Sequence, residues 1–217
     1  MYDSGPNWTR LIRTIGIVLV LIVLPIIVMS TSCTRIDAGH VGIRVKMTGS
    51  NRGVQRSPVT TGWVFVNPIT EKIVEFPTKV LNIVWTRDVN DGSPQDESLT
   101  FASQEGVSIN ADVGLAFHIQ PSKAPRLYER FREDDVLTLA HGYVRSAVRE
   151  ALNEGASQMA VQQIYGPGKT ELLNDALARL NKKLAPDGFI IDQLTFSSAL
   201  RLPDNVVGAI NRAMEAT

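Results

Sequence analysis

The sequence predicts an α+β fold that follows one N-terminal membrane helix, with an antiparallel strand-rich first half and a helix-rich second half. Three observations carry this prediction. An apolar run without a charged side chain occupies residues 15–29. Apolar and polar side chains alternate strictly over residues 107–120, as expected of a strand with one buried face. From Pro121 onward, apolar residues recur every three or four positions, which is the period of a helix.

The N-terminal apolar run is long enough to anchor the chain in a membrane. Extended to residues 14–33, it has the length of about 20 residues that crosses a hydrocarbon core. Arg10 and Arg13 precede it, which favours an N-terminus inside the cell and a body on the extracytoplasmic side. The residues that we expect to form the membrane anchor include Ile15, Val18, Leu21, Leu24, Ile27 and Met29.

Two other interpretations of this segment stay open. A lipoprotein signal would be cleaved before Cys33, which would then carry the lipid, and Thr31 and Ser32 have the small side chains that such processing needs. An ordinary signal peptide would be removed altogether. Changing Cys33 to Ser separates an uncleaved helix from a lipoprotein, because only the lipoprotein depends on that thiol.

The composition argues against several function classes. The formal net charge is zero and no long basic run occurs, so we expect no nucleic-acid partner. A single cysteine excludes an internal disulfide and a thiolate metal site. Gly168 and Lys169 resemble the end of a phosphate loop, but Gln163 stands where that loop needs a glycine. A membrane-tethered hydrolase would need a nucleophile with a base, and no such motif appears. We therefore expect no catalytic residue, metal or cofactor.

The strand-rich part covers residues 34–95. Val41, Ile43 and Val45 alternate with polar residues, and a turn follows at residues 49–53. Pro77 separates two later strands because proline cannot donate to a ladder. The strands predicted in this part are residues 41–48, 63–66, 73–76 and 80–85.

The α/β part covers residues 96–202, and residues 203–217 begin a C-terminal helix. The alternating run predicts one long strand over residues 107–119, with Leu99 and Phe101 in its hairpin partner. Pro203 opens the last helix, because proline is favoured at the first helical turn. The other elements predicted here are helices over residues 124–131, 134–152 and 169–184 and a strand over residues 189–196.

Three aromatic residues of the strand-rich part are candidates for contact with the membrane surface. Trp63, Phe65 and Trp85 carry large rings of the kind that settle at the headgroup level of a bilayer. The alternative for each ring is ordinary packing in the core.

Six short motifs follow one another in a fixed order along the chain. They are residues 38–43 (AGHVGI), 61–68 (TGWVFVNP), 104–109 (QEGVSI), 144–149 (VRSAVR), 188–191 (GFII) and 202–203 (LP). In this order they resemble the SPFH (band 7) family, which includes stomatins, prohibitins and flotillins. Glu105 stands where the family usually has an aspartate.

The resemblance implies a scaffold rather than an enzyme. It implies residues 1–33 as cytoplasmic tip and transmembrane anchor, 34–95 as the membrane-proximal SPFH subdomain, 96–202 as the α/β subdomain and 203–217 as the start of a stalk helix. It also implies a large homo-oligomer, a ring or cage, that contacts membrane lipids. Such an assembly would organise membrane microdomains or regulate client membrane proteins, such as an AAA+ protease. The alternative is an envelope lipoprotein of the same fold, held by lipid on Cys33.

Overall fold

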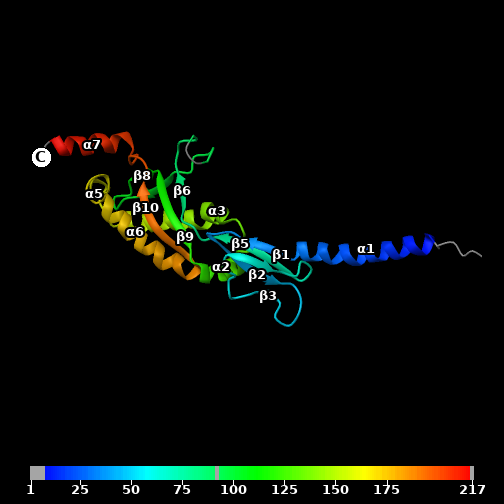
Figure 1. Cartoon of the computed structure of the whole chain (residues 1–217). Coiled ribbons are helices and arrows are strands. Elements are labelled where there is room, and N and C mark those ends of the chain that lie inside the picture. Colours follow the sequence, from blue (N-terminus) through cyan, green and yellow to red (C-terminus); the bar gives the residue numbers. More distant parts are fainter. Residues whose placement is uncertain (1–7, 91–92, 216–217) are drawn as a thin grey trace, which may run out of the picture.

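The computed structural model describes residues 8–90 and 93–215 of the 217-residue chain. Figure 1 shows a long helix, α1 (Trp8–Thr31), projecting from the body of the molecule. Strands form the part of the body next to α1, and most of the helices lie farther from it. The side chains of residues 9–11, 26–31, 210–211 and 213–215 lie outside the described part. The last helix, α7 (Asp204–Glu215), lies at the far end of the body from α1.

The part of the body next to α1 is built from two small antiparallel sheets. The first pairs β1 (Cys33–Ile36) with β4 (Gly62–Phe65). The second has the order β3-β2-β5, formed by β3 (Gly53–Val54), β2 (His40–Lys46) and β5 (Glu71–Pro77). β2, β4 and β5 confirm the strands predicted over residues 41–48, 63–66 and 73–76, whereas β1 and β3 were not predicted. The fourth predicted strand, over residues 80–85, is also present as β6 (Leu81–Trp85), and it begins after β5 has ended at Pro77.

Ile36, Val64 and Val66 form a small buried cluster between these two sheets. Gly42 on β2 makes this packing possible, because a Cβ atom at that position would lie 2.4 Å from Cδ1 of Ile36. The absence of a side chain at Gly42 therefore lets β1 cross closely over β2.

The rest of the body contains a three-stranded antiparallel sheet and a separate hairpin. The sheet has the order β10-β9-β6, formed by β10 (Phe189–Phe196), β9 (Val113–Ile119) and β6 (Leu81–Trp85). The hairpin pairs β7 (Leu99–Ala102) with β8 (Ser108–Ala111), which confirms Leu99 and Phe101 as partners of the alternating run. The remaining helical elements are η1 (Pro121–Lys123), α2 (Ala124–Phe131), α3 (Val136–Leu139), a π-helical turn η2 (Ala140–Val144), α4 (Arg145–Ala156), α5 (Val161–Tyr165), α6 (Lys169–Leu184) and η3 (Ala185–Asp187).

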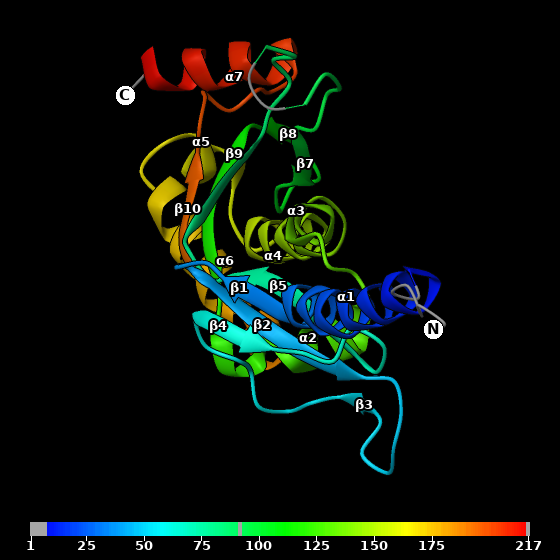
Figure 2. The same cartoon turned by 45° about the vertical axis from the view of Figure 1, so that its right-hand side comes forward.

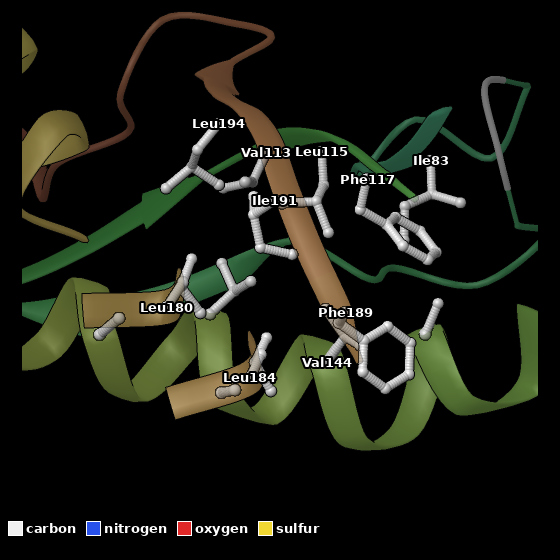
Figure 3. Close-up of a cluster of buried hydrophobic side chains, with 14 of the residues drawn as sticks. Ile83, Val113, Leu115, Phe117, Val144, Leu180, Leu184, Phe189, Ile191 and Leu194 are labelled. Atoms are coloured by element: carbon white, nitrogen blue, oxygen red, sulfur yellow. The ribbon is translucent and has the colours of Figure 1, made fainter. Parts of the chain in front are cut away.

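One buried cluster joins the sheet to the helices. Figure 3 shows Leu115 and Phe117 of β9 and Ile191 of β10 lying with Leu180 and Leu184 of α6. The same cluster includes side chains of β2 and β5, so the described body shares one main core. The strand-rich and helix-rich halves are thus confirmed, while the subdomain boundary near residue 95 stays a prediction.

Two predicted elements differ from the structure. The single strand over residues 107–119 is wrong: the chain forms β8 and β9, which separate at Asp112 and pair with different partners. The helix predicted over residues 134–152 is present, but it contains one π-helical turn, η2, between its α-helical parts α3 and α4. The break in the strand arises from a contact of Asp112 with a distant part of the chain, which is described below.

Candidate membrane-facing surface

β4 turns two aromatic side chains outward beside the end of α1. Alternation along the strand buries Val64, while Trp63 and Phe65 are 69% and 70% exposed. The register pairs Phe65 with Cys33, which is the first residue of the strand that follows α1. The outward rings therefore lie next to the point where α1 joins the body.

The loop after β4 adds a third exposed apolar side chain at this place. The amide of Val66 donates to the carbonyl of Ser32 (2.7 Å), so the loop stays beside the α1–β1 junction. Asn67 shapes the loop, because its side-chain oxygen accepts from the amide of Ile69 (3.0 Å). Ile69 is 84% exposed, the largest value among the exposed large hydrophobic side chains of the described residues.

Met47 completes what we call the apolar rim, defined as Met47, Trp63, Phe65 and Ile69. The amide of Met47 donates to the carbonyl of Thr70 (2.8 Å), which places Met47 beside the same loop, and its side chain is exposed. Soluble proteins rarely expose several large apolar side chains close together, so such a patch indicates a binding surface.

Basic side chains lie on β2, which leads to Met47. Arg44 and Lys46 both approach Glu71, at 3.7 Å and 3.8 Å, and Arg44 also donates to the carbonyl of Phe65 (3.5 Å). Two cations share one carboxylate, so the local charge is positive. Cations beside exposed aromatic rings suit a surface that contacts anionic headgroups.

The structure places the predicted anchor residues on α1. Ile15, Val18, Leu21 and Leu24 are exposed there, as are all side chains described over residues 12–25. Ile27 and Met29 also belong to α1, but their side chains lie outside the described part. Within the described residues, no helix combines the length and the apolarity that crossing a membrane requires.

The other two predicted site residues, Cys33 and Trp85, differ in how deeply the structure buries them. Cys33 is half-buried at the start of β1 as a free thiol. Trp85 is fully buried in the main core, because β6 pairs with β9 and Trp85 lies opposite Val113. Its ring therefore does not reach a surface, and core packing is the correct interpretation for this residue.

The described residues bring together no set of side chains typical of catalysis. His118 pairs with Asp192 (2.8 Å), and His141 pairs with Glu97 (3.1 Å). Within the same described residues, no group of three or more His, Cys, Asp or Glu side chains is arranged to hold a metal ion. The apolar rim is thus the candidate site that the geometry supports best.

A comparison with protein-family models matches residues 34–217 to the SPFH domain / Band 7 family. The matched region covers the whole body together with α7. No curated protein matches the chain.

Proposed function

Because this chain belongs to the SPFH domain / Band 7 family, we propose that it is a non-enzymatic, membrane-anchored scaffold whose copies assemble into a ring or cage. The apolar rim beside the α1–β1 junction is the observation that carries this proposal. A body that presents exposed rings at the base of an apolar helix is suited to lie against a bilayer.

The helix α1 supplies the anchor in this proposal. Its side chains over residues 14–25 carry no charge and are exposed on all sides, so they need an apolar surrounding. Pro25 lies inside the helix, where neighbouring backbone groups in a membrane accommodate its missing donor. The body then lies on the extracytoplasmic side, with the N-terminus inside.

The short α1–β1 connection holds the body close to the bilayer surface. Only Ser32 separates α1 from β1, so the rim stays at the depth of the headgroups. Trp63 and Phe65 settle among the headgroups, and Arg44 and Lys46 face lipid phosphates. Two kinds of contact, one apolar and one cationic, therefore orient the body as well as anchoring it.

A shared orientation favours assembly between copies. Anchored chains present the same face at the same height, which raises their effective concentration for lateral contact. The resulting ring or cage encloses or organises other membrane proteins, such as an AAA+ protease, and sorts the surrounding lipids.

A lipid-anchored form is the second candidate. Cys33 begins β1 and lies opposite Phe65, so lipid attached there would enter the bilayer beside the apolar rim. In that form α1 is removed and the rim keeps its role.

The mass of the full-length, detergent-extracted protein tests the scaffold proposal. We expect large closed particles by light scattering and negative-stain imaging, whereas a uniform single-chain particle would contradict assembly. The same preparation of Cys33→Ser separates the two anchors. A transmembrane form keeps its size and membrane retention, and a lipoprotein loses incorporated fatty acid and stays unprocessed.

A further inference from the structure

A hollow of about 760 Å³ opens on the body between β6, the loop that precedes β7, and α3. We call it the acidic hollow, and the lining residues used below are Ser93, Glu97, Asp135, Leu137 and His141. It lies away from the apolar rim, and the proposed membrane contact does not use it.

One carboxylate oxygen of Glu97 lacks a hydrogen-bond donor in this hollow. Its Oε1 atom lies 3.1 Å from Nδ1 of His141, and its backbone carbonyl accepts from Arg145 (2.8 Å). Its Oε2 atom is buried and has no hydrogen-bond partner among the described residues. A buried carboxylate oxygen without a donor is costly, so a missing donor is expected here.

Asp135 adds a second negative charge. Its side chain accepts from the hydroxyl of Thr138 (2.7 Å) and from the amide of Leu137 (2.9 Å). These two hydrogen bonds, the hydroxyl first, lower the pKa of Asp135, so it is ionised at neutral pH. The hollow therefore favours a cationic occupant.

The β6 edge beside the hollow is unprotected. At the opposite edge of the sheet, the side-chain amide of Asn181 occupies both the N–H and the carbonyl of Ile191, each at 2.9 Å. An irregularity in pairing also interrupts β10 after Ile191. In contrast, β6 has no charged residue or proline and, among the described residues, pairs only with β9. An edge of this kind accepts an extended segment.

The chain itself contains a segment with the complementary charge. The loop between β2 and β4, residues 47–61, has Arg52 and Arg56 as its only charged side chains. Both are exposed, and within the described residues neither makes an ion pair or a side-chain hydrogen bond. Figure 2 shows the part of this loop around the short strand β3 extending away from the body.

We propose that the acidic hollow receives the 47–61 loop of a second copy of this chain. Arg52 and Arg56 face Glu97 and Asp135, and the main chain of the loop lies along the free edge of β6. The proposal deepens the scaffold function and rests on it, because anchored copies must stand side by side for the two surfaces to meet.

The position of the two surfaces makes the contact head-to-tail. In Figures 1 and 2 the β3 loop extends from one side of the body, and the described parts of the β6–β7 loop, residues 86–90 and 93–98, extend from the opposite side. Each copy then donates a loop to one neighbour and offers a hollow to the other. A contact of this kind closes into a ring when its rotation permits.

Two variants of the full chain break opposite halves of this contact. Arg52→Glu with Arg56→Glu reverses the charge of the loop and leaves the hollow intact. Leu137→Arg places a bulky cation in the hollow and leaves the loop intact. Leu137 is exposed, and the backbone amide at this position still donates to the Asp135 side chain that caps α3. Ser93→Arg serves as a second blocking variant if Leu137→Arg fails to fold. Arg126→Glu with Arg149→Glu is the control, because it makes the same charge change at two other exposed arginines.

Each variant alone is expected to give single chains in detergent by light scattering, while the control keeps the wild-type mass. An equal mixture of the loop and hollow variants is expected to give two-chain particles and no rings, since only one intact contact remains. Variants that assemble like wild type, or a mixture that stays single-chain, would overturn this interface but leave the scaffold function standing. A single-chain wild-type protein would overturn both.

Discussion

Arg201 and Asp112 form a bidentate ion pair that fixes where the chain leaves the body toward α7. The two oxygen–nitrogen distances are 2.5 Å and 2.7 Å, and Asp112 is buried. Asp112 also accepts from the hydroxyl of Ser198 (2.6 Å) and the amide of Arg87 (3.0 Å). Arg201 in turn donates to the side-chain oxygen of Asn110 (2.7 Å). The segment after β10 is thus tied to the boundary between β8 and β9.

Replacing Arg201 with alanine should destabilise the body and release α7. The change leaves the Asp112 carboxylate buried without its cation, a situation that costs about 3 kcal/mol at the lower end of the usual range. The lower end applies because Arg201 is about one-third exposed. Urea unfolding of the full chain in detergent, followed by tryptophan emission, measures this loss.

Arg201→Lys is the matched control for this change. It keeps the positive charge but loses the planar fork that contacts both oxygens, so an intermediate loss of stability is expected. Equal stability of the wild type and Arg201→Ala would show that the pair does not hold the C-terminal segment.

The same pair predicts a loss of stability in acid. Hydrogen bonds from Arg201, and to a smaller extent from Ser198, hold the pKa of Asp112 well below its usual range. In the unfolded chain this carboxyl titrates near its ordinary value of about 3.9. Below about pH 4 the unfolded chain therefore binds more protons, and stability falls as the pH drops.

Asp112→Asn isolates this contribution. The variant should be less stable than wild type at pH 6, and the difference should shrink below pH 4 by up to about 1.4 kcal/mol per pH unit. Urea unfolding at pH 6, 3 and 2 measures both proteins. A constant difference across this range would show that Asp112 titrates normally in the folded chain.

Asp112 also explains why the sequence predicted one strand where there are two. It occupies a polar position in the alternating run, so nothing local marks it as buried. What ends β8 and starts β9 is its contact with Arg201, which lies 89 residues later in the chain. The alternation identified the correct inward side chains, but the break depends on a distant partner.

The candidate site was likewise predictable only in part, because local sequence shows which residues are apolar but not which way they point. The aromatic residues of β4 and β6 were all visible in the sequence, yet only the sheet register decides that Trp63 points outward and Trp85 inward. Ile69 carried no sequence signal beyond its place after Asn67 and Pro68. The acidic hollow was not predictable either, because Glu97 and His141 are 44 residues apart.

Filling the space at Gly42 should separate β1 from β2. A Cβ atom there would meet Cδ1 of Ile36 at 2.4 Å and Cγ2 of Ile73 at 3.2 Å. Gly42→Ala should therefore cost about 1 kcal/mol, the lower end for overpacking, since the nearest atom ends a side chain. Urea unfolding measures the loss.

Ile36→Val provides the matched test, because it removes the clashing methyl group. Alone it should cost about 1 kcal/mol, but added to Gly42→Ala it should cause no further loss. Gly142→Ala is the control, since nothing lies within 4 Å of its Cβ position. Additive losses at Gly42 and Ile36 would argue against the close crossing of β1 over β2.

The depth of Trp63 in the membrane tests the apolar rim directly. The chain has three tryptophans, Trp8, Trp63 and Trp85, of which Trp85 is fully buried. In a Trp8→Phe background reconstituted in vesicles, lipids brominated near the headgroups should quench Trp63 and spare Trp85, because amphipathic rings settle at that depth.

The control, Trp8→Phe with Trp63→Phe, keeps only Trp85 and should show little quenching. Adding Phe65→Ser and Ile69→Ser to the Trp8→Phe background should weaken the quenching, since the rim then loses two apolar contacts. Equal quenching with and without Trp63 would place the rim away from the bilayer and contradict the proposed membrane contact.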